Sequence, residues 1–431
     1  MMSEKSSERI HSNVWIILAC AWAAVASSQV ITFGYGMMMP SIMQEMNVGT
    51  EVMGSIGGIA SWVTVLLTIP GSLIAVRFNP KYSVPVVAIC MATGLFLFGR
   101  ATTIPMMYAS RILAASFANM ITTCLVGAKL RGVPQSKIQQ VNGIENFIGP
   151  IGQVIATLAM AQILIALGSW RQVYQTIAII MVVAAVLYFI MWGNGKNIQY
   201  GQQAAQPAQP AANEKGTFEA LKEAWSNKVV WLTSLAWPGT TIVWIAMFYF
   251  WPTYATTTLD ISLQQAGTVL SMIPIFSAIA SLTSPMLAKK IGYDKPLIWP
   301  WGFILPICYY MMTFVTSIPL LCVFSAIAGY GAYCFVPLAF TNIYKLGMSR
   351  KAVTLGTATV LTFVAVGTAI AGTVVGALTA TFGLRNAIAI SCLTPLWFGV
   401  LTFFLPELGR KKMEEMAAAR AKAAQAPAAK E

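Results

Sequence analysis

The stretch Pro70-Gly-Ser-Leu-Ile-Ala-Val-Arg-Phe-Asn-Pro-Lys81 closes one long apolar segment, and a similar stretch, Pro285-Met-Leu-Ala-Lys-Lys-Ile-Gly-Tyr-Asp-Lys295, closes another 215 positions later (70 to 285). A second pair has almost the same offset, because Gly168-Ser-Trp-Arg171 corresponds to Gly383-Leu-Arg385, 214 positions later (171 to 385). A fixed offset between similar stretches indicates an internal repeat. The chain therefore consists of two halves that repeat in the same orientation.

The composition excludes a water-soluble globule. Of the 431 residues, 57% are hydrophobic and only 10% are charged, whereas a soluble domain has about 25% charged residues. A bilayer core of about 30 Å needs about 20 apolar residues per helix. Cutting the sequence at charged and Pro/Gly/Asn-rich breaks predicts an all-α membrane protein with twelve transmembrane helices in two parallel six-helix repeats, at residues 13–39, 51–76, 83–102, 105–128, 138–166, 171–192, 229–256, 264–288, 296–317, 319–344, 353–381 and 385–406.

The distribution of basic residues predicts how the chain is oriented in the membrane. In the twelve-helix topology, 23 of the 27 lysines and arginines lie in the two tails and in the loops on the same side as the tails. Such positive loops mark the cytoplasmic side. We therefore expect a multi-pass protein of the plasma or inner membrane with both termini in the cytoplasm. The net charge of +13 then reflects topology, and we expect no nucleic-acid partner.

The same cuts divide the chain into five regions. Within the central loop, a low-complexity linker precedes Thr217-Phe-Glu-Ala-Leu-Lys-Glu-Ala-Trp225, whose pattern predicts a short amphipathic helix on the inner membrane face. The predicted regions are a cytoplasmic N-tail (1–12), an N-terminal six-helix bundle (13–192), a cytoplasmic central loop (193–228), a C-terminal six-helix bundle (229–406) and a cytoplasmic C-tail (407–431).

Residues that commonly support metal binding or covalent catalysis are scarce. His11 is the only histidine, and the seven cysteines are scattered through the apolar segments. This pattern argues against a metal site, a redox pair and a His-based triad. We expect no cofactor and no enzymatic activity.

Several fragments, together with the repeat, carry a family resemblance. They include Pro40-Ser-Ile-Met at the end of the first predicted helix and Trp251-Pro-Thr-Tyr254 at the end of the seventh. With them the sequence resembles the major facilitator superfamily over about residues 10–409. The resemblance implies a secondary transporter that works by alternating access, in which the halves rock around a cavity lined by helices 1, 4, 7 and 10.

The sequence departs from the family pattern in the turn between helices 2 and 3. Ala75 and Val76 occupy the region of the usual acid, and Asn79-Pro80 replaces Gly-Arg. The ion pair that the resemblance implies for this gate is therefore in doubt in the first half. In the second copy, Asp294 either forms a related ion pair or is a solvated loop charge.

Two ionisable residues fall inside predicted spans, where charge is costly and therefore functionally informative. Arg111 lies about six residues, or roughly 9 Å of rise, into the fourth helix. It either binds an anionic substrate or bonds neighbouring carbonyls structurally. Glu145, in the fifth helix, is our proton-coupling candidate, and a structural hydrogen bond near the inner gate is the alternative.

Polar and aromatic residues on the helices that the resemblance places around the cavity complete the predicted pocket. Each of them could instead pack against a neighbouring helix. The predicted substrate-binding residues are Arg111, Gln29, Asn119, Trp237, Trp244, Tyr249, Tyr330 and Tyr333.

For a secondary active transporter of the kind that the resemblance implies, one embedded cation with an aromatic lining predicts a small organic anion as the substrate, most simply a carboxylate. The first alternative is a proton-coupled multidrug efflux antiporter that uses Glu145. A non-transporting membrane sensor or scaffold is the alternative from another class. The expected partners are the anionic substrate, membrane lipids and protons as a candidate coupling ion, and we expect a monomer.

Overall fold

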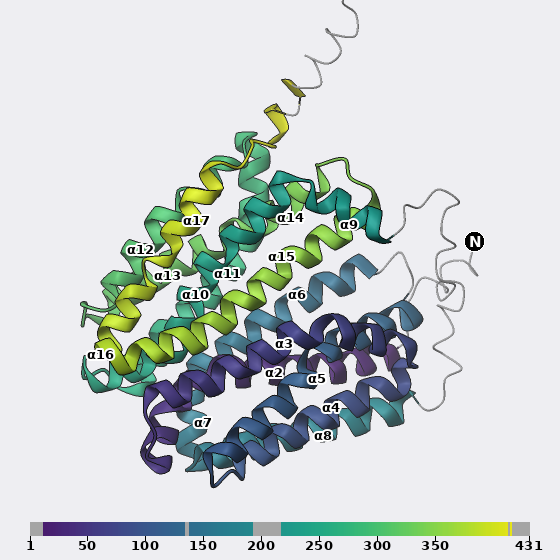
Figure 1. The fold of residues 1–431 in the computed structure, drawn as a ribbon. Coiled ribbons are helices and arrows are strands. Elements are labelled where there is room, and N and C mark those ends of the chain that lie inside the picture. The colour runs from purple at the N-terminus through teal and green to yellow at the C-terminus, as the bar shows by residue number, and fades with distance from the viewer. Residues whose placement is uncertain (1–11, 134–137, 193–216, 413, 416–431) are drawn as a thin grey trace, which may run out of the picture.

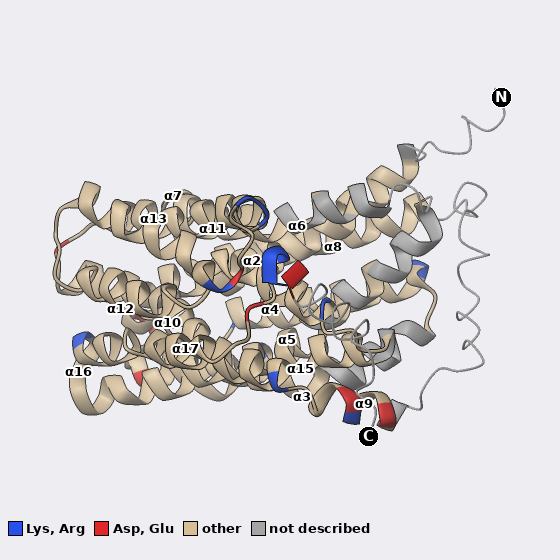
Figure 2. Ribbon diagram, turned by 90° about the horizontal axis from the view of Figure 1, so that it is seen from above, with Lys and Arg blue, Asp and Glu red and all other residues tan. Residues whose placement is uncertain are grey.

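The computed structural model describes residues 12–133, 138–192, 217–412 and 414–415. In these ranges the chain forms helices and connecting turns with no strand, which confirms the all-α prediction. Figure 1 shows the two halves side by side, the first in purple and blue and the second in teal to yellow. The helices run roughly parallel to one long axis, and they carry few charges along their length (Figure 2).

Six helical segments form the N-terminal half. The fifth of them is continuous through a π-helical stretch, η2, which joins two α-helices. The segments are α2 (Ser12–Met46), α3 (Thr50–Arg77), α4 (Pro80–Gly99), α5 (Ile104–Gly132), α6 with η2 and α7 (Ile138–Val154, Ile155–Ala159 and Met160–Leu167), and α8 (Trp170–Trp192).

The C-terminal half repeats this order. Gly383 (φ 78°, ψ 162°) breaks α16, so its first part ends the eleventh segment and its second part begins the twelfth. The segments are α10 (Lys228–Thr257), α11 (Leu263–Ile291), α12 (Trp301–Met311) after the short η4 (Lys295–Leu297), α13 with α14 (Ile318–Cys334 and Val336–Tyr344), α15 with η5 and α16 (Arg350–Ile370, Ala371–Val375 and Gly376–Ser391), and α17 (Thr394–Phe403).

The twelve predicted segments are therefore present, although some ends differ. The first helix continues to Met46, past the predicted end at residue 39, because Pro40 is accommodated inside α2. Hydropathy in the described residues marks nine candidate spans, and the last of them, Ala352–Phe403, contains two segments because the window runs through Gly383.

The two halves meet closely near the end of the bundle opposite the termini, which we call the far end. A Cβ added at Gly54 of α3 would lie 2.7 Å from the Gly372 carbonyl oxygen, and one at Gly372 would lie 2.6 Å from the Gly58 Cα. The hydroxyls of Thr50 and Thr379 hydrogen-bond across the same contact at 2.7 Å. Small residues thus allow the backbones of the two halves to touch, as in other membrane helix pairs.

Repeat-related π-helical stretches lie in both halves beside these contacts. The stretch η2 begins at Ile155 and η5 at Ala371, an offset of 216 (155 to 371). The η5 glycine Gly372 meets α3, and a Cβ added at Gly267 of α11 would lie 2.2 Å from the Thr157 carbonyl oxygen in η2. Both halves therefore carry the same irregularity of helical hydrogen bonding where they meet. Such π-helical stretches are frequent at functional sites.

The end of the bundle opposite the far end is called the near end. There, an ion-pair network connects segments of the C-terminal half. Lys345 Nζ lies 2.6 Å from Asp294 Oδ2 and also donates to the Leu408 carbonyl at 2.9 Å. Glu407 accepts hydrogen bonds from the backbone N–H groups of Asp294 and Lys295 at 2.8 and 3.0 Å. The sequence left open whether Asp294 forms an ion pair or is a solvated loop charge, and the structure shows an ion pair.

The predicted amphipathic helix is present as α9 (Thr217–Trp225). It packs Ala220 and Ala224 against Ala352 of α15. The Glu223 carboxylate accepts from both the backbone N–H and the hydroxyl of Ser349, the N-cap of α15, at 3.1 and 2.8 Å. The helix thus fastens the end of the central loop to the start of the eleventh segment.

Candidate substrate-binding site

Arg111 is buried inside the bundle, with 5% of its surface exposed. Its position in α5 follows from the uninterrupted apolar sequence on both sides, which keeps the helix in the membrane and carries the guanidinium with it. The guanidinium carbon lies 4.9 Å from the centroid of the Tyr35 ring and 5.8 Å from that of Phe98. The cation is therefore held between aromatic rings, which attract it weakly through their quadrupoles.

Three tyrosines from three different helices surround this cation. Tyr35 comes from α2, Tyr174 from α8 and Tyr249 from α10, and each is at most 2% exposed. All three lie close enough to Arg111 to interact with it electrostatically. Since Tyr249 belongs to the C-terminal half, the cation of one half lies near a side chain of the other.

The hydrogen-bonding capacity of this cluster is only partly used. The Tyr35 hydroxyl donates to the Met53 carbonyl at 2.6 Å, but the buried Tyr174 hydroxyl and Arg111 Nε have no hydrogen-bond partner. In the part of the chain that the structure describes, no carboxylate forms an ion pair with Arg111. A guanidinium offers five N–H donors and keeps its charge at all relevant pH values. The cluster therefore presents unused donors around a fixed positive charge, an arrangement that favours an anion.

Two further predicted residues form an aromatic wall in the C-terminal half. The rings of Trp244 and Tyr333 lie 5.2 Å apart, and Trp244 lies 5.3 Å from Phe248. Phe248 in turn contacts Phe33 of α2 at 4.9 Å. Trp244 and Phe248 share α10 with Tyr249, whereas Tyr333 comes from α13. Part of this wall therefore lies on the same helix as the tyrosine near Arg111.

Three other predicted residues, Trp237, Tyr330 and Gln29, contact groups outside the Arg111 cluster. Trp237 packs in the core of the C-terminal half, where its ring is 5.2 Å from Phe335. Tyr330 bonds Thr283 of α11 at 3.0 Å and lies against Trp301 of α12. Gln29 of α2 is half-buried and packs against Gly152 of α6. The side chains of Asn119 and Glu145 lie outside the described part of the structure, so their predicted roles stay predictions.

Sequence reasoning missed three residues around the cation: Tyr35, Tyr174 and Phe98. Tyr35 could have been predicted, because it lies six positions after Gln29 in the first helix, which the resemblance places at the cavity. Tyr174 and Phe98 lie in the sixth and third segments, which the resemblance does not place at the cavity. Only tertiary packing brings the two rings to Arg111, because α4 packs against α5 and α8 packs against α4 and α2.

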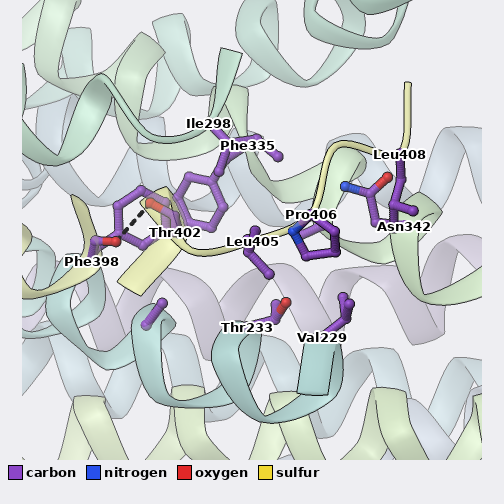
Figure 3. Close-up of a pocket in the computed structure, with 12 residues that line it drawn as sticks. Val229, Thr233, Ile298, Phe335, Asn342, Phe398, Thr402, Leu405, Pro406 and Leu408 are labelled. Atoms are coloured by element: carbon purple, nitrogen blue, oxygen red, sulfur yellow. Dashed lines mark hydrogen bonds between the residues drawn. The ribbon is translucent and has the colours of Figure 1, made fainter. Parts of the chain in front are cut away.

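A small cavity lies elsewhere, at the near end of the C-terminal half (Figure 3). Its volume is about 10 Å³, which suits one water molecule at most. Val229 and Thr233 of α10 line one side, and Phe398 and Thr402 of α17 line another. The Thr402 hydroxyl donates to the Phe398 carbonyl at 2.7 Å, as the dashed line shows. This cavity is too small for an organic solute.

Two related helical halves around a buried cation, with their closest contacts at one end, define a membrane transporter architecture. The family model described as Major Facilitator Superfamily matches residues 21–309, which is more than half of the chain. The chain belongs to this family.

Individual relatives agree with this assignment. An uncharacterized MFS-type transporter, YfnC of Bacillus subtilis (strain 168), is 28% identical over 165 residues, which cover 38% of this chain and 36% of that protein. The chain thus matches about a third of the length of that curated relative.

Solved structures share the fold at low sequence identity. A bacterial homolog of the human lysosomal transporter Spinster, in an inward-facing and unoccupied conformation, is similar with a TM-score of 0.74 at 15% identity, over 91% of this chain and 96% of that one. The nucleoside transporter NupG has a TM-score of 0.70 at 13% identity, over 92% of this chain and all of that one (100%).

Proposed function

We propose that this member of the Major Facilitator Superfamily moves a small organic anion, most simply a carboxylate, across the membrane by alternating access. The observation that carries the proposal is Arg111, a buried guanidinium without a carboxylate partner among the described residues. Leaving such a charge unpaired in a bilayer costs several kcal/mol. A carboxylate substrate supplies the missing countercharge and matches the planar guanidinium.

The tyrosine hydroxyls give the substrate further partners. The Tyr174 hydroxyl has no hydrogen-bond partner in the structure, and Tyr249 reaches Arg111 from the other half. An anion held by Arg111 and Tyr249 contacts both halves, so its binding free energy favours their approach. The aromatic wall of Trp244 and Tyr333 supports a substrate with an aromatic or apolar body.

The direction of the chain in the membrane is part of the proposal. Cytoplasmic termini agree with the positive loops, and they make the far end, where Thr50 bonds Thr379, the outer gate. We further propose the plasma or inner membrane as the location, a monomer as the working unit, and Glu145 as the residue through which protons are coupled to transport. Labelling single cysteines placed in either tail of intact cells tests the orientation, because cytoplasmic tails stay unlabelled by an impermeant reagent.

Ligand binding to the purified protein tests the substrate class. Benzoate, benzamide and benzylamine share one ring and differ in charge, so a thermal-shift series with these probes isolates the charge preference. We expect benzoate and other carboxylates to raise the midpoint of thermal unfolding, and the rise to be larger for ligands that bind more tightly. Benzamide and benzylamine should leave the midpoint unchanged. Stabilisation by amines alone, or by no member of a wider carboxylate panel, contradicts the proposal.

A matched pair of arginine variants then assigns the effect to the site. Arg111→Gln removes the buried charge, whereas Arg100→Gln removes an exposed charge at the end of α4. Carboxylate stabilisation should vanish only in Arg111→Gln. Equal losses in both variants mean that overall charge, and not this site, attracts the anion.

A further inference from the structure

A second, larger groove lies on the outside of the C-terminal half, and none of the residues that line it belongs to the Arg111 cluster. It has a volume of about 600 Å³ and runs between α12 and the region from the end of α16 to the start of α17. Its apolar lining includes Ile307, Phe382 and Leu393, which are 59%, 56% and 55% exposed. Large apolar side chains exposed on a membrane-spanning helix face lipid, so this groove opens to the bilayer.

An arginine lies next to this groove, linked to it through two aromatic rings. The Arg385 guanidinium carbon is 4.5 Å from the centroid of the Phe314 ring, and Phe314 is 4.8 Å from the ring of Tyr310. Tyr310 lines the groove. Tyrosines and cations of this kind gather where a bilayer meets water. The groove therefore leads from an apolar wall to a positively charged, aromatic end.

The backbone fixes the place of Arg385 at this end. Gly383 adopts φ 78° and ψ 162° and turns the chain from the eleventh into the twelfth segment. Asn386, which also lines the groove, donates from its side-chain amide to the Phe382 carbonyl at 3.0 Å and braces the turn. Arg385 lies between Gly383 and Asn386, so its position relative to the groove follows from the turn.

The charge of Arg385 is available, in contrast to that of its repeat counterpart. Arg171, at the equivalent position of the first half, forms an ion pair with Glu45 at 2.6 Å. Arg385 is exposed, and no carboxylate forms an ion pair with it among the residues placed by the structure. A phosphate group can occupy this position without displacing a protein carboxylate.

We propose that the groove binds one anionic phospholipid of the leaflet at the far end, with an acyl chain along Ile307 and Leu393 and the headgroup phosphate on Arg385. An acyl chain fits the apolar wall, and the negative headgroup complements the available cation. The site is independent of the proposed substrate, because it shares no residue with the Arg111 cluster. It would make the C-terminal half sensitive to the lipid composition of that leaflet.

Native mass spectrometry of the purified full chain in detergent micelles tests the site, with phosphatidylglycerol and phosphatidylcholine of identical acyl chains as probes. One interfacial arginine should favour the anionic lipid by about fivefold in dissociation constant. Arg385→Gln should abolish this preference and leave phosphatidylcholine binding unchanged, whereas Arg385→Lys should keep most of it. Ala389→Trp, which fills the groove, should weaken both lipids.

Arg100→Gln is the matched control, because it removes an exposed arginine at the same end of the other half. It should retain the preference. The proposal is overturned if Arg385→Gln keeps the full preference, or if Arg100→Gln loses it to the same extent. It is also overturned if lipid-free protein is a dimer that Ala389→Trp dissociates, since the groove then holds a second copy of this chain.

Discussion

The two halves share one helical order but place their charges in different regions. The N-terminal half carries a buried cation, Arg111, about two turns after the start of α5 at Ile104, while the position 215 residues later in the repeat is Ala326 (111 to 326). The C-terminal half instead carries its buried charge at the near end, where Asp294 pairs with Lys345. The comparison teaches that a repeat can preserve the helical framework while the buried charges are placed differently in its two halves.

The largest effect on transport is expected from removing the charge of Arg111, which has no counterpart in the second half. Arg111→Gln should lower the kcat/KM of carboxylate uptake into proteoliposomes by about a hundredfold, since losing one partner of a buried charged pair costs about 3 kcal/mol. Arg100→Gln should stay close to wild type. Uptake by Arg111→Gln at the wild-type rate would show that this cation is structural.

The next effect concerns the contact between the halves. Gly372→Val places side-chain atoms where the backbone of Gly58 lies, and such overpacking costs about 1–3 kcal/mol. We expect uptake to fall about tenfold and the far end to close less often. Disulfide formation between cysteines introduced at Thr50 and Thr379, in a background without native cysteines, measures closure.

Gly149→Val provides the control for this contact, because a Cβ at Gly149 of α6 would meet no atom within 4 Å. It should cross-link at the wild-type rate. If Gly372→Val cross-links equally well, the glycine contact does not limit closure of the far end.

A smaller effect is expected from the near-end ion pair of the second half. The Asp294 and Lys345 side chains are 6% and 28% exposed, so Asp294→Asn leaves a largely buried ammonium without its countercharge. We expect a loss of about 2 kcal/mol in stability, seen as a lower thermal midpoint. The double variant Asp294→Asn/Lys345→Met should lose less than the sum of the single changes. Additive losses would mean that the two groups do not interact.

The smallest effect is expected at the corresponding far-end pair of the first half. Glu45 is 45% exposed, and it accepts a hydrogen bond from Trp170 as well as pairing with Arg171. Glu45→Gln keeps the acceptor and removes the charge, so stability should change by less than about 1 kcal/mol. If Glu45→Gln lowers stability as much as Asp294→Asn does, the two ion pairs contribute equally and the halves do not differ in this respect.

Much of the fold followed from local properties of the sequence. Apolar runs, the repeat offset and α9 were predictable because hydropathy and helix period depend on neighbouring residues. The end of the first helix was not, because Pro40 is a breaking signal that α2 accommodates within its length. The ion pair of Asp294 could not be predicted from the sequence either, because its partner Lys345 lies 51 positions away.

The sequence by itself determined that Arg111 lies inside a membrane span, because its depth depends only on the apolar residues on either side of it. Which side chains surround that cation was decided by tertiary structure alone. Tyr35, Tyr174 and Tyr249 come from α2, α8 and α10, and no local pattern relates them. A buried charge is stabilised by whatever groups packing brings within a few ångströms, and packing depends on the shapes of whole helices rather than on the residues next to Arg111 in the chain.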